Sequence, residues 1–452
     1  MSAEDVEAAI ERITARDAGL GRDAKVAAYQ LTAGEGEEVI HQAGLQDDLW
    51  WRVPKRFPPD SWHDIARAAA ALLDELGLDR YAAIARSDTT TEILDGWAVS
   101  PPEGHKRAMA ARKASGVAAP DTDLLAWGQI FGGYESAALE SVERALEAAI
   151  VAGELVPGGR GWKQRAVEVT ERTLQAPLDL PPGQTLATMV ITERVEGWIR
   201  AAHDSAVAER RQAAVNRLLS PIDPPDGFES VVAPMQWLLG HAADGIELTQ
   251  AGYLARALVV EGTERFAWLP DWAKPPRSEV DVFAVGDLRE VASSLRLVRK
   301  KGRTLTATSA GKALLADPAG LWRVLASSLG GEDEFAQVLA ELVGLCLLDG
   351  PAYGNSLSDD VQPMLAELGW QVEGRPLDVN FVRSSIWRPL HWWRTIAVAD
   401  HRSARWDRET HQEAEPSSEW LTDAGRATVL AYLRERAIRP PEVTATTARP
   451  FS

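Results

Sequence analysis

Basic residues are concentrated in the stretch "RLVRKKGRTLTATSAGK" (296–312), where a helix is expected to end and a β-hairpin to begin. Guanidinium and ammonium groups displayed on such a hairpin can hold the phosphate backbone of a duplex. A second basic group lies in residues 381–408, on a later helix and its hairpin. The predicted nucleic-acid-binding residues are Arg296, Arg299, Lys300, Lys301, Arg303, Arg383, Arg388, Arg394, Arg402 and Arg405.

The charge balance of the whole chain opposes a uniform interaction with nucleic acid. The net charge is -18, but residues 286–312 carry seven basic and two acidic side chains, and residues 381–408 carry six and two. An exposed hairpin is often charged, and the C-terminus of a helix favours cations, so both groups also fit a solvated surface. The charge pattern is therefore compatible with two binding partners, duplex DNA or another protein. Unpaired cations on one face would favour DNA, whereas scattered or internally paired cations would favour a protein.

Motifs for phosphate or dinucleotide binding fail on inspection. In "TATSAGKALL" the lysine is followed by Ala313, where a P-loop needs Ser or Thr, and Thr306 stands where the first glycine belongs. The glycines of "GELVPGGRGW" (153–162) lack the strand and helix that a dinucleotide fingerprint requires, which favours a turn. No cofactor is expected.

Metal-competent side chains gather in "ADHRSARWDRETHQEAE" (399–415), where His401, His411 and Glu413 would be the ligands of a metal-dependent enzyme. Their spacing matches no known motif, so a polar hairpin turn is the preferred interpretation and no metal is expected. His241 is isolated from any serine or cysteine nucleophile in the sequence. Enzyme activity is accordingly the minority alternative.

The pattern of the chain predicts a mainly α protein with small hairpins. Prolines in 176–183, 220–227 and 269–278 interrupt helical patterns and mark linkers. Residues 193–219 are expected to form one long helix. The expected domains are an N-terminal helical region (1–118), a winged-helix-like unit (119–180), a long helix and linker (184–230), a helical domain with a winged-helix-like unit (231–330), a C-terminal winged-helix-like domain (331–438) and a disordered tail (439–452).

A local pattern of alternating residues, threonine and glycine recurs in "GIELTQAG", "TLTATSAG" and "EWLTDAG". It predicts a short strand followed by a helix that Thr249, Thr308 or Thr422 caps, with the glycine allowing close packing. A weaker fourth copy, "AVEVTERTL" (166–174), would place a strand before Thr170. Each copy follows a helix and a turn, which gives helix, hairpin and helix, the layout of a winged-helix unit.

Three segments carry a resemblance to known sequences: "MQWLLGHAADGIELTQAGYLARALV" (235–259), "LRLVRKKGRTLTATSAGKALLADPAGLWRVLA" (295–326), and the pair "RPLHWWRTIAV" and "WLTDAGRATVL". They resemble a family of uncharacterised actinobacterial proteins built from serial winged-helix-like units. The resemblance covers the second half of the chain. It implies a fold, and it implies no catalytic or binding residues.

Composition adds weaker expectations. The 17 tryptophans include the pairs Trp50–Trp51 and Trp392–Trp393, whose apolar neighbours favour core packing over stacking on bases. No apolar run approaches the roughly 20 residues of a membrane span, and the start resembles no signal peptide, so a cytoplasmic protein without membrane contact is expected. The sequence thus predicts a non-enzymatic, DNA-associated regulatory or accessory protein, with a winged-helix protein scaffold as the alternative.

Overall fold

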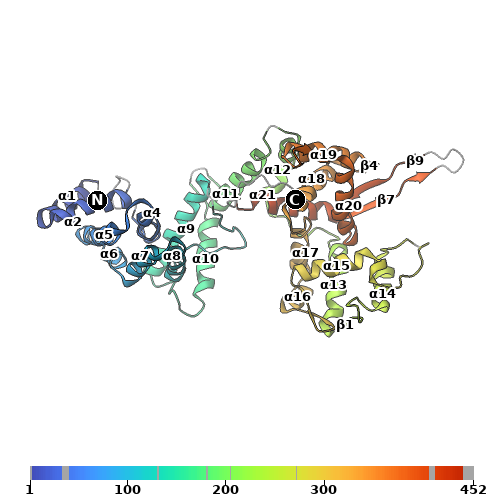
Figure 1. Cartoon of the computed structure of the whole chain (residues 1–452), viewed down its shortest axis with the longest axis horizontal. Coiled ribbons are helices and arrows are strands. Elements are labelled where there is room, and N and C mark those ends of the chain that lie inside the picture. Colours follow the sequence, from blue (N-terminus) through green and yellow to red (C-terminus); the bar gives the residue numbers. More distant parts are fainter. Residues whose placement is uncertain are drawn as a thin grey trace. The chain divides into compact units, whose positions relative to one another are not determined.

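The computed structural model describes residues 3–32, 40–129, 132–179, 182–203, 205–270, 272–406 and 413–440. These residues fall into two compact units, one within residues 1–193 and the other within 194–439 (Figure 1). Helices dominate both units, and strands form only small antiparallel sheets. The predicted mainly α class is therefore confirmed. The predicted tail lies outside the described residues from position 441 onward.

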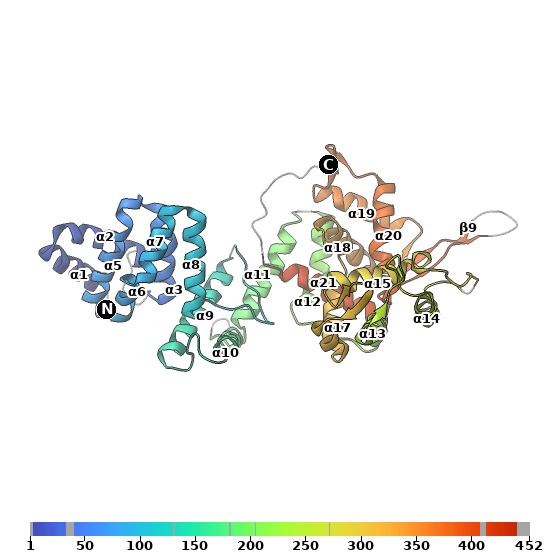
Figure 2. The same ribbon diagram turned by 60° about the horizontal axis from the view of Figure 1, so that its bottom comes forward.

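Unit 1 is entirely helical apart from its connections. Its helices are α1 (Ala3–Arg16), α2 (Ala18–Thr32), α3 (Gln42–Asp47), the π-helical turn η2 (Asp48–Arg52), α4 (Val53–Arg56), the 3₁₀ turn η3 (Pro59–Ser61), α5 (Trp62–Glu75), α6 (Asp79–Ala85), α7 (Asp88–Val99), α8 (Pro101–Ser115), α9 (Gly133–Val151), α10 (Trp162–Gln175) and the first half of α11 (Leu186–Arg200). Helices α1, α2 and α5 pack together, and α7 packs along α8 (Figures 1 and 2).

The tryptophan pair of η2 forms the centre of the larger core in unit 1. Trp50 and Trp51 are 2% and 8% exposed and pack with residues of α5, α7 and α8. The Trp50 indole N–H donates to Thr90 Oγ1 at 3.0 Å, so burial leaves no polar atom of that ring unsatisfied. Trp392 and Trp393 of unit 2 are equally buried. The prediction that both pairs pack in a core is confirmed.

The helices α9 and α10 occupy the region that was expected to hold a first hairpin. Residues 166–169 lie inside α10, where Ala166, Val169 and Leu174 face the core beside Leu146 of α9. The strand predicted before Thr170 is therefore wrong. The buried residues Ala166, Thr170 and Leu174 recur at four-residue steps with Val169 beside them, and the helical period prevails because it buries one continuous face.

Unit 2 alternates helices with short strands. Its elements are α12 (Ala206–Leu218), α13 (Glu229–Asp244), β1 (Ile246–Glu247), α14 (Arg256–Phe266), the 3₁₀ turn η4 (Glu279–Asp281), α15 (Phe283–Ser294), β2 (Val298–Lys301), β3 (Thr304–Ala307), α16 (Ser309–Leu315), α17 (Pro318–Ser327), α18 (Glu334–Asp349), β4 (Ala352–Tyr353), α19 (Ser356–Glu367), β5 (Gln371–Val372), β6 (Arg375–Pro376), α20 (Val379–Thr395), β7 (Ala399–Arg402), β8 (Arg405–Trp406), β9 (Glu413–Glu415), β10 (Ser418–Leu421) and α21 (Asp423–Ile438).

The same order of elements occurs twice in unit 2. We call α13–β1–α14–α15–β2–β3–α16 the first module and α18–β4–α19–α20–β7–β10–α21 the second module. In each module the strand after the first helix pairs antiparallel with the last strand, which gives the sheet orders β1–β3–β2 and β4–β10–β7. The second module adds two features, the β5–β6 hairpin before α20 and the β8–β9 extension between β7 and β10. We call β2–β3 the first hairpin and β7–β10 the second hairpin.

Matching hydrogen bonds show that the two modules share more than their order. Thr308 caps α16 by accepting from the Gly311 amide at 3.0 Å, and its hydroxyl donates to the Arg296 carbonyl at 2.8 Å. Thr422 caps α21 in the same way, accepting from Gly425 at 2.9 Å, and donates to the Ala397 carbonyl at 2.8 Å. The predicted caps at Thr308 and Thr422 are confirmed.

Two further expectations are wrong. Thr249 lies in a turn where its hydroxyl accepts from the Tyr253 amide at 3.1 Å, and α14 begins only at Arg256. Thr249 follows the first strand of its module, whereas the capping threonines follow the last strand. The predicted long helix 193–219 consists of α11 and α12, because Ser205 caps a new helix by accepting from the Ala208 amide at 3.3 Å.

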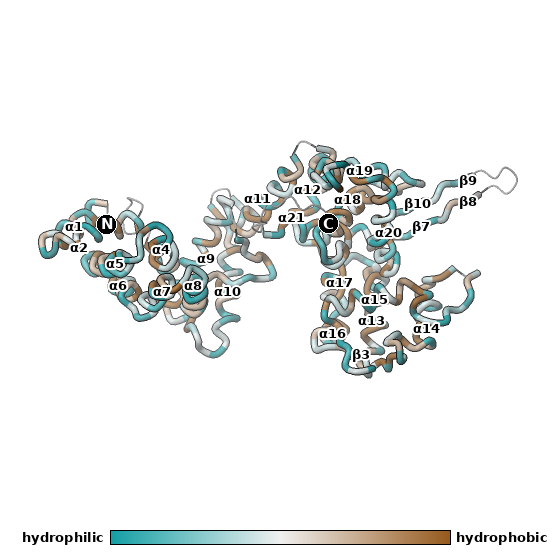
Figure 3. The backbone as a smooth tube through the Cα atoms, in the orientation of Figure 1, coloured by the Kyte–Doolittle hydropathy of each residue, from teal (hydrophilic) through white to brown (hydrophobic). Residues whose placement is uncertain are grey.

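The first helix of each module is rich in hydrophobic residues, as the brown segments of α13 and α18 show (Figure 3), and most of these residues are buried. The helix α18 is buried from Val338 to Leu348, and α13 buries Val231, Trp237 and Leu238 among others. Glu341 of α18 is fully buried and receives two arginines, Arg211 of α12 at 2.6 Å and Arg436 of α21 at 2.7 Å. This triad joins three helices of unit 2, and a buried carboxylate without such partners would be costly.

A methyl group at Gly425 tests the close packing after the second hairpin. Its Cβ would overlap the Val398 carbonyl, so Gly425→Ala should lower the free energy of unfolding by about 1–3 kcal/mol. Gly240→Ala in α13 is the control, because its Cβ meets no atom within 4 Å, and it should be neutral or stabilise by about 0.5–1 kcal/mol. Chemical denaturation measures both; equal effects of the two substitutions would contradict the packing argument.

Asp48 in η2 makes the stability of unit 1 depend on pH. Burial raises the pKa of Asp48 from 3.8 to about 6, against the opposing effect of Arg52. Between about pH 4 and pH 6 the unfolded chain therefore loses a proton that the folded chain keeps, so stability falls as the pH rises through this window. Asp48→Asn should remove that fall and stabilise unit 1 at pH 7.5 on the order of 1–3 kcal/mol. Denaturation at pH 4.5 and 7.5 checks this, and an unchanged pH dependence in the variant would refute it.

Candidate nucleic-acid interface

The first hairpin presents its basic residues to solvent while its apolar residues hold it to the module. Val298 and Leu305 are 4% and 2% exposed. Arg299, Lys300 and Lys301 follow Val298 in β2 and are all exposed. The strand register, Val298 opposite Ala307 and Lys301 opposite Thr304, leaves Gly302 and Arg303 to make the turn. The apolar residues thus anchor the hairpin while the cations of β2 project into solvent.

Four of the five predicted cations of this region make no ion pair with any residue that the structure describes. They are Arg296, Arg299, Lys300 and Lys301, all exposed. Arg303 differs, because its guanidinium donates to the Leu248 carbonyl at 3.1 Å and lies 3.6 Å from Glu247. Arg303 therefore secures the hairpin against β1, while the other four are available to an anion.

The five arginines of the second group are spread over three elements, α20, β7 and β8, and four of them have acidic partners. The pairs are Arg388 with Glu290 at 3.5 Å, Arg394 with Glu419 at 3.2 Å between Nε and Oε2, and both Arg402 and Arg405 with Glu415 at 3.9 Å. Arg383 instead contacts Asn380 at 3.4 Å and Ser358 at 3.5 Å. The structure does not bring this group together with the first hairpin as one free basic face.

The helices that precede the two hairpins, α15 and α20, pack against each other. His391 Nδ1 lies 2.7 Å from Asp287 Oδ2, and the Trp387 and His391 rings stack with centroids 4.7 Å apart. Phe283 of α15 meets the Trp387 ring edge-on at 5.7 Å. Sequence reasoning missed Asp287 and His391, because 104 residues separate them and no local spacing signals the pair.

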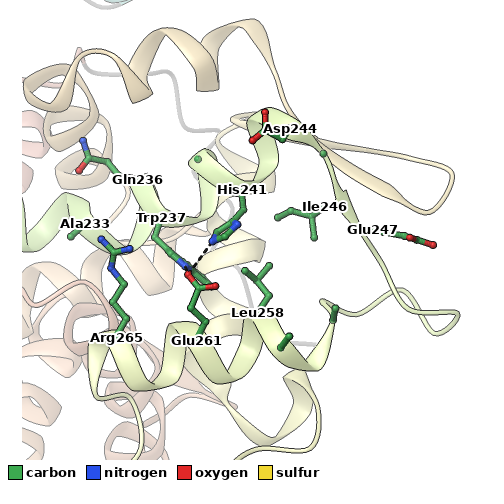
Figure 4. Close-up of a pocket in the computed structure, with 14 residues that line it drawn as sticks. Ala233, Gln236, Trp237, His241, Asp244, Ile246, Glu247, Leu258, Glu261 and Arg265 are labelled. Atoms are coloured by element: carbon green, nitrogen blue, oxygen red, sulfur yellow. Dashed lines mark hydrogen bonds and ion pairs between the residues drawn. The ribbon is translucent and has the colours of Figure 1, made fainter.

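A cleft of about 840 Å³ opens between α13, α14 and β1 (Figure 4). Glu261 of α14 reaches toward α13, where it accepts from the Trp237 indole at 2.9 Å and lies 3.1 Å from His241 Nε2. These hydrogen bonds, the indole's first, hold the pKa of Glu261 below its usual range. The described side chains that line the cleft include no serine, threonine, cysteine or lysine, so none of them offers this histidine–carboxylate pair a hydroxyl, thiol or amine nucleophile.

The metal hypothesis falls largely on residues that the structure does not describe. His411 lies outside the described residues, and Glu413 is placed only as the first residue of β9. His401 is exposed in β7 and pairs across the sheet with Glu419. Within the described ranges, no three His, Cys, Asp or Glu side chains are arranged to hold a metal ion. The minority enzyme hypothesis gains no support from these positions.

Comparison with known proteins identifies one segment. Residues 230–320 match the Y4jL N-terminal domain family, and this range runs from α13 to the start of α17. The matched residues include the whole first hairpin and agree with the resemblance of this part to uncharacterised proteins. No curated protein and no solved structure matches the chain. In the parts of the chain that the structure describes, no helix has the length and apolarity needed to cross a bilayer.

The two groups of arginines should differ in their contribution to stability. Arg394 and Glu419 are about one-fifth exposed, so Arg394→Gln leaves a half-buried carboxylate without its partner and should cost about 1–3 kcal/mol. Arg299→Gln removes an exposed charge without an ion pair and should stay within about 0.5 kcal/mol of wild type. Thermal and chemical denaturation compare the two. Equal losses would show that pairing does not distinguish the groups.

Proposed function

We propose that this protein is a non-enzymatic, DNA-associated accessory or regulatory protein of the cytoplasm that contacts the phosphate backbone through the first hairpin. The observation that carries the proposal is the set of four exposed cations, Arg296, Arg299, Lys300 and Lys301, which have no acidic partner in the described residues. In the second group, by contrast, Arg388, Arg394, Arg402 and Arg405 each have a glutamate within 4 Å. An unpaired cluster of this kind releases counterions when it meets a polyanion.

We further propose that the two modules are winged-helix units. The order helix, strand, two helices and hairpin, with the first strand beside the last, supports this assignment. The resemblance to actinobacterial proteins with serial winged-helix-like units points the same way. In a winged-helix unit the hairpin lies where the protein meets the DNA backbone, which is the position of the four cations.

The proposed contact does not read bases. Helix α15 precedes the first hairpin and would be the helix to enter the major groove, but it carries Asp287 and Glu290 and packs on α20. Carboxylates on that surface repel phosphates. We therefore expect binding that is independent of DNA sequence, weak at physiological salt, and steeply dependent on ionic strength.

A protein scaffold is the second candidate function. The internal pairing favours it: Arg394 has Glu419, and Arg388, Arg402 and Arg405 lie 3.5–3.9 Å from a glutamate, and a neighbouring carboxylate reduces the attraction of a cation to a polyanion. Winged-helix units serve both roles, so fold alone does not choose between them.

Electrophoretic shift assays on a long mixed-sequence duplex test the DNA proposal. The triple variant Arg299→Glu, Lys300→Glu and Lys301→Glu should abolish binding, because each phosphate contact contributes about -0.9 to the slope of log K against log salt. The control variant reverses three exposed lysines of unit 1, Lys55, Lys106 and Lys113, and changes the net charge equally.

The control should lower the affinity much less than the hairpin variant. Circular dichroism should show both variants folded, since exposed hairpin residues contribute little to stability. If wild-type protein fails to shift the duplex even at low salt, or if both variants lose binding equally, the first hairpin is not a DNA contact and the protein scaffold becomes the better account.

A further inference from the structure

Phe283 of α15 meets the Trp387 and His391 rings of α20 edge-on, at 5.7 and 6.0 Å between ring centroids, and still exposes most of its apolar surface. Phe283 is 65% exposed, and Val280 in the turn before α15 is 62% exposed. Together with Tyr253, Asp287 and Glu290 they line a shallow groove of about 450 Å³, which we call the α15 groove. Exposed apolar residues that lie together and are rimmed by polar side chains are typical of interaction sites.

The charges around the α15 groove are predominantly acidic. Glu279 and Arg289 form a 3.0 Å pair that is largely buried, so they contribute no net charge. Asp287 and Glu290 remain, and their partners His391 and Arg388 belong to α20. The Glu290–Arg388 pair is 3.5 Å long with both side chains at least 70% exposed, and such a solvated pair is weak enough for Glu290 to accept another cation.

We propose that the α15 groove docks a protein segment that carries a large apolar side chain next to a lysine or arginine. The apolar residue would lie against Phe283 and Val280, and the basic residue would pair with Glu290. This charge complementarity excludes nucleic acid from the groove, because a polyanion would meet two carboxylates and no free cation. The proposal is independent of the first hairpin, so its failure and the failure of the DNA proposal are separate results.

A phage library of random 12-residue peptides, selected on the full-length wild-type protein and depleted on a Phe283→Asp variant, tests the proposal. The enriched peptides should place a large apolar residue within four positions of a lysine or arginine. Fluorescence anisotropy of labelled peptides should then show binding at least tenfold weaker to Phe283→Ala. Glu290→Lys should weaken binding of the basic peptides by a similar factor, whereas versions with glutamate at the basic position should bind it better than they bind wild type.

Val99→Ala is the matched control, since Val99 is 75% exposed on a different unit and should leave peptide binding unchanged. Thermal melting of each variant separates a lost contact from a lost fold. The proposal is overturned if depletion leaves no peptides, if the enriched peptides are acidic, or if they bind Glu290→Lys as well as wild type. Self-association of wild type that Phe283→Asp abolishes would overturn it in favour of a second copy, and duplex binding lost in Phe283→Asp would overturn it in favour of DNA.

Discussion

The contact between a helix glycine and the carbonyl just before a hairpin fixes the geometry of both modules in unit 2. Gly311 and Gly425 are the third residues of α16 and α21, and a Cβ atom on either would overlap the carbonyl of Leu297 or Val398, which directly precedes the hairpin. Thr308 and Thr422 stand directly before these helices, and their hydroxyls accept from the amides of the same two glycines. These contacts, together with the pairing of β1 with β3 and of β4 with β10, hold each hairpin against its module. The way the hairpin is held decides which of its residues, including the charged ones, face solvent.

Pairing of charge decides which basic residues remain available. Unit 2 contains many arginines, and most of the predicted ones are neutralised by glutamates of neighbouring elements, as Arg394 is by Glu419. Two further arginines, Arg211 and Arg436, form ion pairs with the buried Glu341. The first hairpin differs, because the buried side chains of Val298 and Leu305 hold it in place. The exposed cations of β2 are therefore not needed for structural ion pairs. A locally positive surface thereby persists on an acidic chain.

The packing of α15 on α20 separates two kinds of surface within the first module. Asp287 and His391 join the two helices, and Phe283 meets Trp387 beside them. The hairpin that follows α15 is basic and polar, whereas the α15 groove beside this helix contact is acidic and apolar. One module can therefore offer a polyanion and a protein segment two different surfaces. The second module has the same order of elements, but Arg402 of β7 and Arg405 of β8 share one acidic partner, Glu415, at 3.9 Å from each.

Local patterns determined the helical class, the two hairpins and the caps at Thr308 and Thr422, because helical periodicity and capping depend only on residues close in the chain. They failed at Thr249, whose surroundings look the same over eight residues but which follows a first strand instead of a last one. They also placed a strand at 166–169, where the packing of α10 on α9 favours a helix. The basic residues were all visible in the sequence. Only the tertiary structure decided which of them are free, because Glu290, Glu415 and Glu419 reach their arginines from other elements, and no spacing within the chain encodes that approach.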